Sequence, residues 1–232
     1  ANVYVRSYKA QGARIGLNLD VVCGVDLLDA VEREWVWFYL HHSAPLVVVM
    51  STPCTHMFGW KGINAQKNPV SYYRGRQVSE ELAVFGAHVA DFQLNEDRDF
   101  FDEHPKGSDK FQMLVWKQIL RRDYVSFCFM DQCQTGLVDR KSGLPIRKST
   151  QLTASNELLL SRFRKLRCEG ARSCEARGLQ HAQIEGANLS KRSQVWTWTF
   201  ARKLADGIAD LLQSKYYTCF MYFPTSEGGW II

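Results

Sequence analysis

The sequence has no apolar run that approaches the roughly 18 residues needed to cross a membrane. Its first ten residues also lack the basic stretch followed by an apolar stretch that marks a secretory signal. These absences predict an intracellular protein of the nucleus or cytoplasm that does not associate with a membrane. Because the chain begins with Ala1 in place of Met, we expect either a trimmed terminus or a piece of a longer polypeptide, such as a polyprotein.

Regular cysteine spacing, internal repeats and low-complexity linkers are also lacking. The seven cysteines are odd in number and scattered, which indicates thiols in a reducing compartment rather than a disulfide framework. With 232 residues, 46% of them hydrophobic, the chain is long enough to bury a core. We therefore predict a single domain, 1–232.

Charge is unevenly distributed along the chain. Residues 140–203 contain 14 Lys or Arg against four Glu, a balance of +10, whereas the whole chain carries +5. Such a segment suggests a surface that binds a polyanion, although a solvated helix face would have the same composition.

Apolar runs alternate with segments of helical periodicity, which predicts an α/β fold with a single, mainly parallel sheet flanked by helices. Residues 59–76 are rich in Gly, Asn, Ser and Lys and predict a loop. The predicted strands are 3–5, 17–20, 21–26, 45–50, 99–101, 124–130 and 150–153, and the predicted helices are 27–40, 79–95, 111–120 and 194–213.

Two apolar runs lead into reactive side chains. Residues 45–50 precede Cys54, and Phe100-Phe101 precedes Glu103. Active sites of open α/β sheets lie beyond the carboxyl ends of the strands, so a thiol and an acid there suggest a nucleophile with a proton donor. Taken singly, Cys54 could be a buried structural thiol and Glu103 a strand end or helix cap.

Three motifs in order resemble those of cytosine-5 nucleic-acid methyltransferases, in the divergent form carried by some retroelement polyproteins. They are Thr-Pro-Cys-Thr-His-Met-Phe at 52–58, Glu-His-Pro at 103–105 and Gly-Leu-Pro-Ile-Arg-Lys-Ser-Thr at 143–150. The match spans roughly residues 20–153 and implies a Rossmann-like methyltransferase core. Thr55 and His104 depart from the family motifs, and its Phe-x-Gly-x-Gly loop is not visible.

The resemblance implies a transferase that acts on DNA, or as a second choice RNA, after the base leaves its stack. Cys54 would add to carbon 6 of cytosine, and Glu103 would hold a proton at ring nitrogen 3. Lys148 and Arg147 would grip the base carbonyl or a phosphate.

The implied cofactor is S-adenosylmethionine. Ser7 and Gly12 would serve its binding turn, and Pro53 would lie beside it. Asp20 and Asp26, at the ends of the second and third predicted strands, would bind its ribose hydroxyls and adenine amine. Either aspartate could instead be a turn residue.

Residues 155–193 occupy the place of the family's target-recognition region. The segment is short and Arg-rich, which predicts phosphate contacts with limited sequence selectivity, or a further domain elsewhere. The residues expected to contact nucleic acid there are Arg162, Arg164, Lys165, Arg167 and Arg172.

Other readings stay open. Cys168, Cys174 and His181 suggest zinc, but the spacing has no C-x2-C knuckle and no clear fourth ligand, so we predict no metal. His56 beside Cys54 leaves a cysteine hydrolase as a minor alternative. The set Trp196, Trp198 and Phe200 is better explained by core packing than by base stacking. The competing function class is a non-catalytic nucleic-acid-binding module that has lost the cofactor loop.

Overall fold

The computed structural model describes residues 16–59, 61–169, 173–174, 179–182 and 193–220. The strand predicted at 3–5 lies outside these ranges. Eight elements build the sheet and its main helices: α2 (Ala30–Ser43), β1 (Val47–Met50), α4 (Pro69–Asn95), β2 (Asp99–Pro105), α5 (Leu114–Ile119), β3 (Ser126–Asp131), β4 (Ser149–Ala154) and α8 (Trp198–Phe220). The other elements of the described chain are η1 (Val21–Cys23), α3 (Lys61–Lys67), η2 (Asp109–Gln112), η3 (Gln132–Thr135), α6 (Glu157–Ser161), β5 (Ser173–Cys174) and β6 (Leu179–Gln180).

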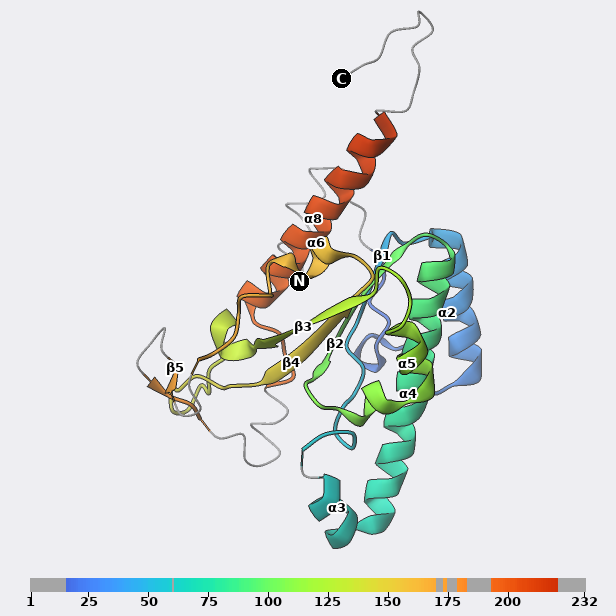
Figure 1. The fold of residues 1–232 in the computed structure, drawn as a ribbon. Helices are drawn as coiled ribbons and strands as arrows, with labels where there is room; N and C mark the ends of the chain where they lie inside the picture. Colours follow the sequence, from blue (N-terminus) through green and yellow to red (C-terminus); the bar gives the residue numbers. More distant parts are fainter. Residues whose placement is uncertain (1–15, 60, 170–172, 175–178, 183–192, 221–232) are drawn as a thin grey trace, which may run out of the picture.

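The four longer strands form one mixed sheet in the order β1-β2-β4-β3 (Figure 1). β1 pairs with β2 in parallel, whereas β4 runs antiparallel to both β2 and β3. The prediction of a mainly parallel sheet is therefore wrong for this sheet, although the prediction of an α/β fold with flanking helices is confirmed. Since β4 alone is reversed, β1, β2 and β3 all end at the same edge, where β4 begins.

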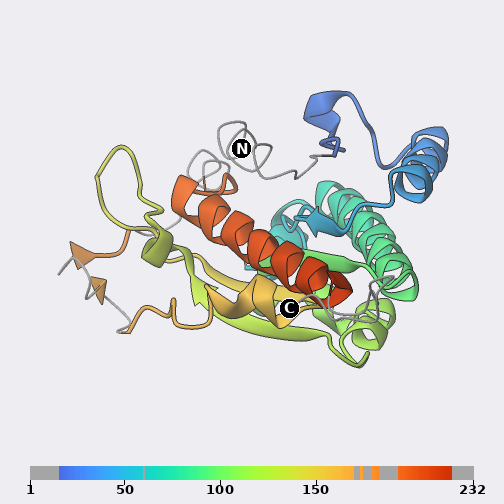
Figure 2. The ribbon, with the colours of Figure 1, turned by 90° about the horizontal axis from the view of Figure 1, so that it is seen from above.

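Helices cover both faces of the sheet (Figures 1 and 2). Successive residues of a strand point to opposite faces, and the adjacent pair in β2 shows this. Phe100 packs into a core with α2, α4 and α5, whereas Phe101 packs into a second core with α6 and α8. Both side chains are fully buried. The adjacent residues Phe100 and Phe101 thus pack into two separate hydrophobic cores, one on each face of the sheet.

The loop predicted at 59–76 is instead helical over 61–67 and from residue 69 onward. α4 begins at Pro69, a residue that suits the first turn of a helix because its missing N–H would have no partner there. By composition Gly75 favours a loop, but in the structure it lets the His56 ring pack closely against α4. A Cβ atom at that position would lie 2.1 Å from the His56 ring. Ser79 donates to the Gly75 carbonyl within the helix, so the helix does not begin at residue 79 as predicted.

The strands predicted at 17–20 and 21–26 are absent from the described chain, which forms η1 and turns there. Asp20 caps η1 by accepting from the Val22 N–H at 2.8 Å, and Asp26 accepts from the Leu28 N–H at 3.0 Å. Capping by short acidic side chains stabilises turns over extended strands. Both acids are exposed turn residues, the alternative that the sequence left open.

The first part of segment 155–193 belongs to the main body. Leu159 and Leu160 of α6 and the following Phe163 are fully buried against α8. Among the described residues of this segment, those of the small antiparallel hairpin of β5 and β6 lie apart from this core. Residues 157–163 therefore belong to the main body instead of an inserted region.

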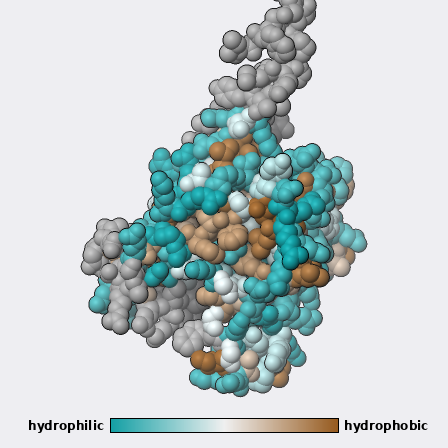
Figure 3. Space-filling model, viewed as in Figure 1, coloured by the Kyte–Doolittle hydropathy of each residue, from teal (hydrophilic) through white to brown (hydrophobic). Residues whose placement is uncertain are grey.

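β3 lies at the edge of the sheet and exposes apolar side chains. Phe127 is 46% exposed, and Figure 3 shows apolar surface in the middle of the face where Figure 1 places this strand.

Among the described residues, no helix is long and apolar enough to span a bilayer.

Candidate functional site

Three residues predicted to be catalytic meet at the edge of the sheet where β1, β2 and β3 end. Cys54 follows β1, Glu103 lies near the end of β2, and Lys148 immediately precedes β4. The Lys148 ammonium lies 3.3 Å from Glu103 Oε1, and the charges of both groups act on the Cys54 thiol. These residues are far apart in the sequence, and they come together because β1 and β2 end, and β4 begins, at this edge.

The Glu103 carboxyl is held in one orientation by donors from four parts of the chain. Its Oε2 accepts from Ser51 Oγ at 2.8 Å and from Trp196 Nε1 at 3.2 Å. Its Oε1 accepts from Gln132 Nε2 at 3.2 Å and faces Lys148. Glu103 is 3% exposed and lies within β2, because this strand continues to Pro105 instead of ending at Phe101 as predicted.

Cys54 carries the nucleophilic atom of this cluster. Burial raises the pKa of its thiol; the positive charge of Lys148 opposes this shift and the negative charge of Glu103 adds to it. A thiol in this balance is protonated at neutral pH and becomes more acidic when the charge of Glu103 is neutralised. The same two residues that would contact a substrate therefore control the nucleophile.

The turn that carries Cys54 is anchored to α4 and η2. The Met57 N–H donates to the Cys54 carbonyl at 3.0 Å, and the Met57 side chain is fully buried. Arg76 of α4 donates to the His56 carbonyl at 3.1 Å and to Asp109 at 2.6 Å. The His56 ring packs against Tyr72 and Gly75 of α4. This orientation takes the imidazole into packing with α4, so the cysteine hydrolase reading gains no support.

A buried ion pair behind the site was not anticipated from the sequence. Lys110 Nζ lies 2.6 Å from Asp102 Oδ1 with both side chains fully buried, and it donates to Thr52 Oγ1 at 3.2 Å. Its ammonium also lies 4.0 Å from the Trp116 ring centroid. Burial lowers the pKa of Lys110, and the charges of Asp102 and Glu103 oppose this. Lys110 thus holds the Thr52 side chain, two residues before Cys54.

His104 stands where the family has Asn, and it is fully buried beside this pair. Burial lowers its pKa well below the ordinary value and the charge of Lys110 adds to this, whereas the nearby Pro53 backbone opposes it. The imidazole is therefore neutral at physiological pH. It packs edge-on against Phe111 and fills space between β2 and η2.

The aromatic residues at the start of α8 and just before it divide between core and site. Phe200 is fully buried, and the Trp196 ring packs 4.7 Å from it and edge-on against Phe101. The packing prediction is confirmed for these residues, whereas Trp198 is 49% exposed. Trp196 also orients Glu103, a contact that the sequence did not indicate.

Most of the described basic residues expected to bind nucleic acid are engaged in ion pairs. Arg162 pairs with Asp210 at 2.6 Å, and Arg164 pairs with Glu157. Arg147 and Arg167 lie 3.5 and 3.6 Å from the two oxygens of buried Asp131. Lys165 is exposed, and Arg172 lies outside the described residues.

Two arginines thus have a structural role at Asp131. Burial by itself raises the pKa of Asp131. The net pKa is nevertheless below the ordinary value, because the carboxylate accepts hydrogen bonds from Ser149 and the Cys168 N–H and is attracted by the charges of Arg167 and Arg147. An ionised carboxylate at the end of β3 therefore ties β4 to the segment at Cys168. Arg147 lies next to Lys148, so its place near the site is as predicted, but its guanidinium faces a buried acid.

The residues assigned to S-adenosylmethionine are not assembled in the described part of the chain. Pro53 adjoins Cys54, whereas Asp20 and Asp26 each commit a carboxylate oxygen to a neighbouring backbone N–H. The strand ends on which their role depended are not formed. Ser7 and Gly12 lie outside the described residues.

Comparison with known proteins gave no relatives. No family model matches the chain, no curated protein matches it, and no solved structure matches its fold.

Proposed function

We propose that this chain is a cytosine-5 methyltransferase-like domain in which Cys54 adds covalently to a pyrimidine base of DNA, or as a second choice RNA. The observation that carries the proposal is the meeting of Cys54, Glu103 and Lys148 at one sheet edge, in the order that the resemblance implies. A carboxyl and an ammonium in contact, with a thiol close enough to feel both charges, are the groups that this addition needs.

The addition follows from the chemistry of the three groups. The Cys54 thiol would first lose its proton to solvent. Its Sγ would then attack carbon 6, the sulfur–carbon bond would form, and the electron pair of the carbon 5–carbon 6 double bond would shift through the ring to nitrogen 3. A proton held between Glu103 and ring nitrogen 3 would neutralise the charge that develops there. Sharing that proton also reduces the negative charge beside Cys54, which favours the thiolate. Lys148 would donate to the base carbonyl.

S-adenosylmethionine would supply the methyl group that the resemblance implies. The described residues do not fit this part, because Asp20 and Asp26 act as turn caps. Methyl transfer therefore rests on the resemblance alone, whereas base activation rests also on the geometry. This difference is what favours the second candidate, a nucleic-acid-binding module without cofactor chemistry.

Two oligonucleotides separate these candidates. A duplex containing 2-pyrimidinone, whose carbon 6 is more electrophilic than that of cytosine, tests addition of the thiol without any cofactor. A duplex containing 5-fluorocytosine gives a stable adduct only after methyl transfer, because fluorine cannot leave carbon 5 as a proton would. We expect covalent complexes with both duplexes, the second requiring S-adenosylmethionine, detected on denaturing gels and by peptide mass spectrometry.

Variants identify the nucleophile. Cys54→Ser should abolish both adducts, whereas Cys128→Ser, which removes a buried thiol of β3, should retain them. An adduct with 2-pyrimidinone alone would establish the nucleophile and exclude methyl transfer in this chain. No adduct with either duplex, together with salt-dependent binding, would overturn the enzyme proposal in favour of the binding module.

A further inference from the structure

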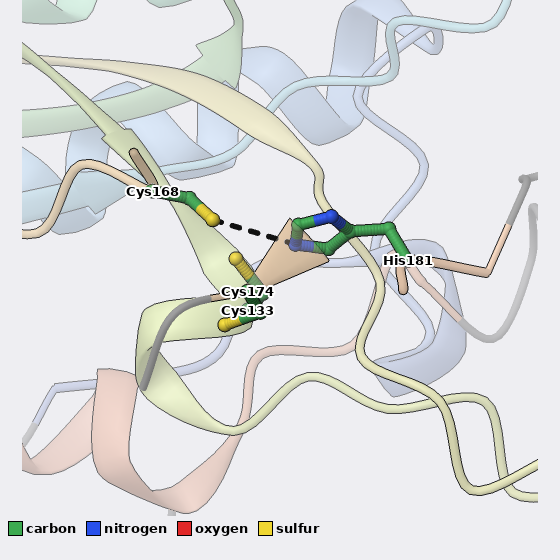
Figure 4. A group of neighbouring side chains, drawn as sticks. All are labelled: Cys133, Cys168, Cys174 and His181. Atoms are coloured by element: carbon green, nitrogen blue, oxygen red, sulfur yellow. Dashed lines mark hydrogen bonds between the residues drawn. The ribbon is translucent and has the colours of Figure 1, made fainter. Parts of the chain in front are cut away.

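Four potential metal ligands converge at the base of the β5–β6 hairpin (Figure 4). They are Cys133 of η3, Cys168, Cys174 of β5 and His181. Their sulfur and imidazole nitrogen atoms all lie within 4.8 Å of one another. Cys168 Sγ lies 3.4 Å from His181 Nε2. The fourth ligand that the sequence spacing lacked is Cys133, which is 35 positions before Cys168 in the chain.

The geometry of the four atoms suits a tetrahedral zinc ion. Zinc binds thiolate sulfur at about 2.3 Å and imidazole nitrogen at about 2.0–2.1 Å, which places neighbouring ligand atoms roughly 3.5–3.8 Å apart. The separations of this cluster therefore need only small side-chain adjustments. Three sulfurs and one imidazole select a soft or borderline ion and disfavour magnesium or calcium, which prefer oxygen. The cysteines are thiols and not disulfides.

The three sulfur ligands are buried apart from the two main cores. Cys133, Cys168 and Cys174 are 2%, 5% and 1% exposed and form a separate small cluster. β5 and β6 contribute only two residues each, and an isolated hairpin of that size is not stable by itself. A metal that crosslinks the hairpin to η3 would provide the stability that its apolar contacts do not.

Neighbouring groups support the ligands in the way that outer-sphere partners do in metal sites. Gln134 Nε2 donates to Cys174 Sγ at 3.4 Å, and the Cys168 N–H donates to the buried Asp131 carboxylate at 2.9 Å. These contacts fix two of the sulfur-bearing segments.

We propose that Cys133, Cys168, Cys174 and His181 bind one structural zinc ion. The site ties the hairpin to the end of β3, where Gln132 immediately precedes the ligand Cys133 and donates to Glu103. Zinc binding thereby holds the Gln132 amide in place at the candidate catalytic carboxyl. The proposal does not depend on the proposed function, because a structural zinc site is equally compatible with a binding module.

The test is the metal content of the purified chain expressed with zinc in the medium. We expect one zinc per chain by plasma mass spectrometry, and visible absorption bands of tetrahedral, thiolate-bound cobalt after exchange for Co²⁺. Hydrogen exchange at 168–182 and at Gln132 should accelerate after chelation. Substoichiometric zinc with all thiols reactive in the native protein, or a disulfide within the cluster, would overturn the proposal.

Matched variants show which thiols bind. Cys133→Ser and Cys174→Ser should each weaken zinc binding at least tenfold, whereas Cys128→Ser and Cys54→Ser should retain full zinc. If the serine variants do not fold, Cys174→His keeps a zinc ligand at that position and should restore both folding and zinc content. Full zinc in a folded Cys133→Ser variant would contradict the assignment of the fourth ligand. Because Cys54→Ser tests only the proposed function, failure of one proposal is distinguishable from failure of the other.

Discussion

The Lys148 ammonium lies 3.3 Å from Glu103 Oε1, and the two groups shift the acidity of Cys54 in opposite directions. The pair is therefore an electrostatic control on the nucleophile. Removing the Glu103 charge lowers the pKa of the Cys54 thiol, and removing the Lys148 charge raises it. Because burial raises the thiol pKa, the thiol is largely protonated near neutral pH, and these two charges determine how readily it forms the thiolate.

Glu103→Gln should lower the pKa of Cys54, because it removes a negative charge that disfavours the thiolate. Lys148→Met should raise it, because it removes a stabilising positive charge. The pH dependence of Cys54 alkylation by iodoacetamide, followed by peptide mass spectrometry, measures both. Lys106→Gln, which neutralises an exposed lysine just beyond β2, is the charge-matched control and should leave the profile unchanged. Shifts of the same sign in the Glu103 and Lys148 variants would contradict this account.

The approximate course of the sheet and the candidate catalytic residues could be predicted from the sequence. Apolar runs mark β1 and β2, and the polar residues that follow them mark the sheet edge. The partners of Glu103 could not be predicted, because Gln132 and Trp196 are 29 and 93 positions away and meet it only in the folded chain.

The direction of β4 also could not be predicted from the sequence. A short strand reads alike in either direction, so pairing with β2 and β3 cannot be inferred from its residues. The start of α4 could not be predicted for a related reason. Gly75 signals a loop by composition, whereas its actual role is to admit the His56 ring, a contact made by a distant segment.

Lys110→Met should destabilise the fold by about 3–5 kcal/mol, because it leaves the Asp102 carboxylate buried without its partner. Combining it with Asp102→Leu should recover most of the loss, since an apolar pair leaves no buried charge. Urea unfolding followed by tryptophan fluorescence measures the free energies. Lys61→Met breaks a partly exposed pair with Asp109 and should cost below about 1 kcal/mol. Equal losses at the two lysines would refute the distinction between buried and exposed pairs.

Gly207→Ala should destabilise the protein by about 1–3 kcal/mol, although the same change in an open helix is stabilising. A Cβ atom at Gly207 would lie 2.8 Å from the Leu158 carbonyl oxygen, so α8 would have to move away from α6. Gly62→Ala in α3 is the control, since no atom lies within 4 Å of its Cβ position.

We expect Gly62→Ala to stabilise by up to about 1 kcal/mol through reduced entropy of the unfolded chain. Urea midpoints of the two variants should therefore move in opposite directions. A stabilised Gly207→Ala variant would show that α6 and α8 are not packed as closely as described.

The ion pairs of the basic residues change how binding to DNA should be tested. Replacing Arg164, Lys165 and Arg167 together would remove a partner of buried Asp131, so a loss of binding could reflect a loss of structure. Lys165 is exposed, and Arg164 is paired with Glu157 on the surface. Single changes at these two positions separate phosphate contacts from folding.

If this surface contacts duplex DNA, affinity should fall with salt, with a log–log slope of about 0.9 for each neutralised phosphate. Lys165→Gln should reduce the slope by about 0.9 through loss of one such contact. Glu157→Gln should increase affinity, because it releases Arg164 from its carboxylate partner. Fluorescence anisotropy of a labelled duplex across a salt series measures both. Lys117→Gln, an exposed lysine of α5 on the opposite face of the sheet, should have no effect. An affinity that does not vary with salt would mean that the basic segment is a solvated surface whose charges serve ion pairs within the chain.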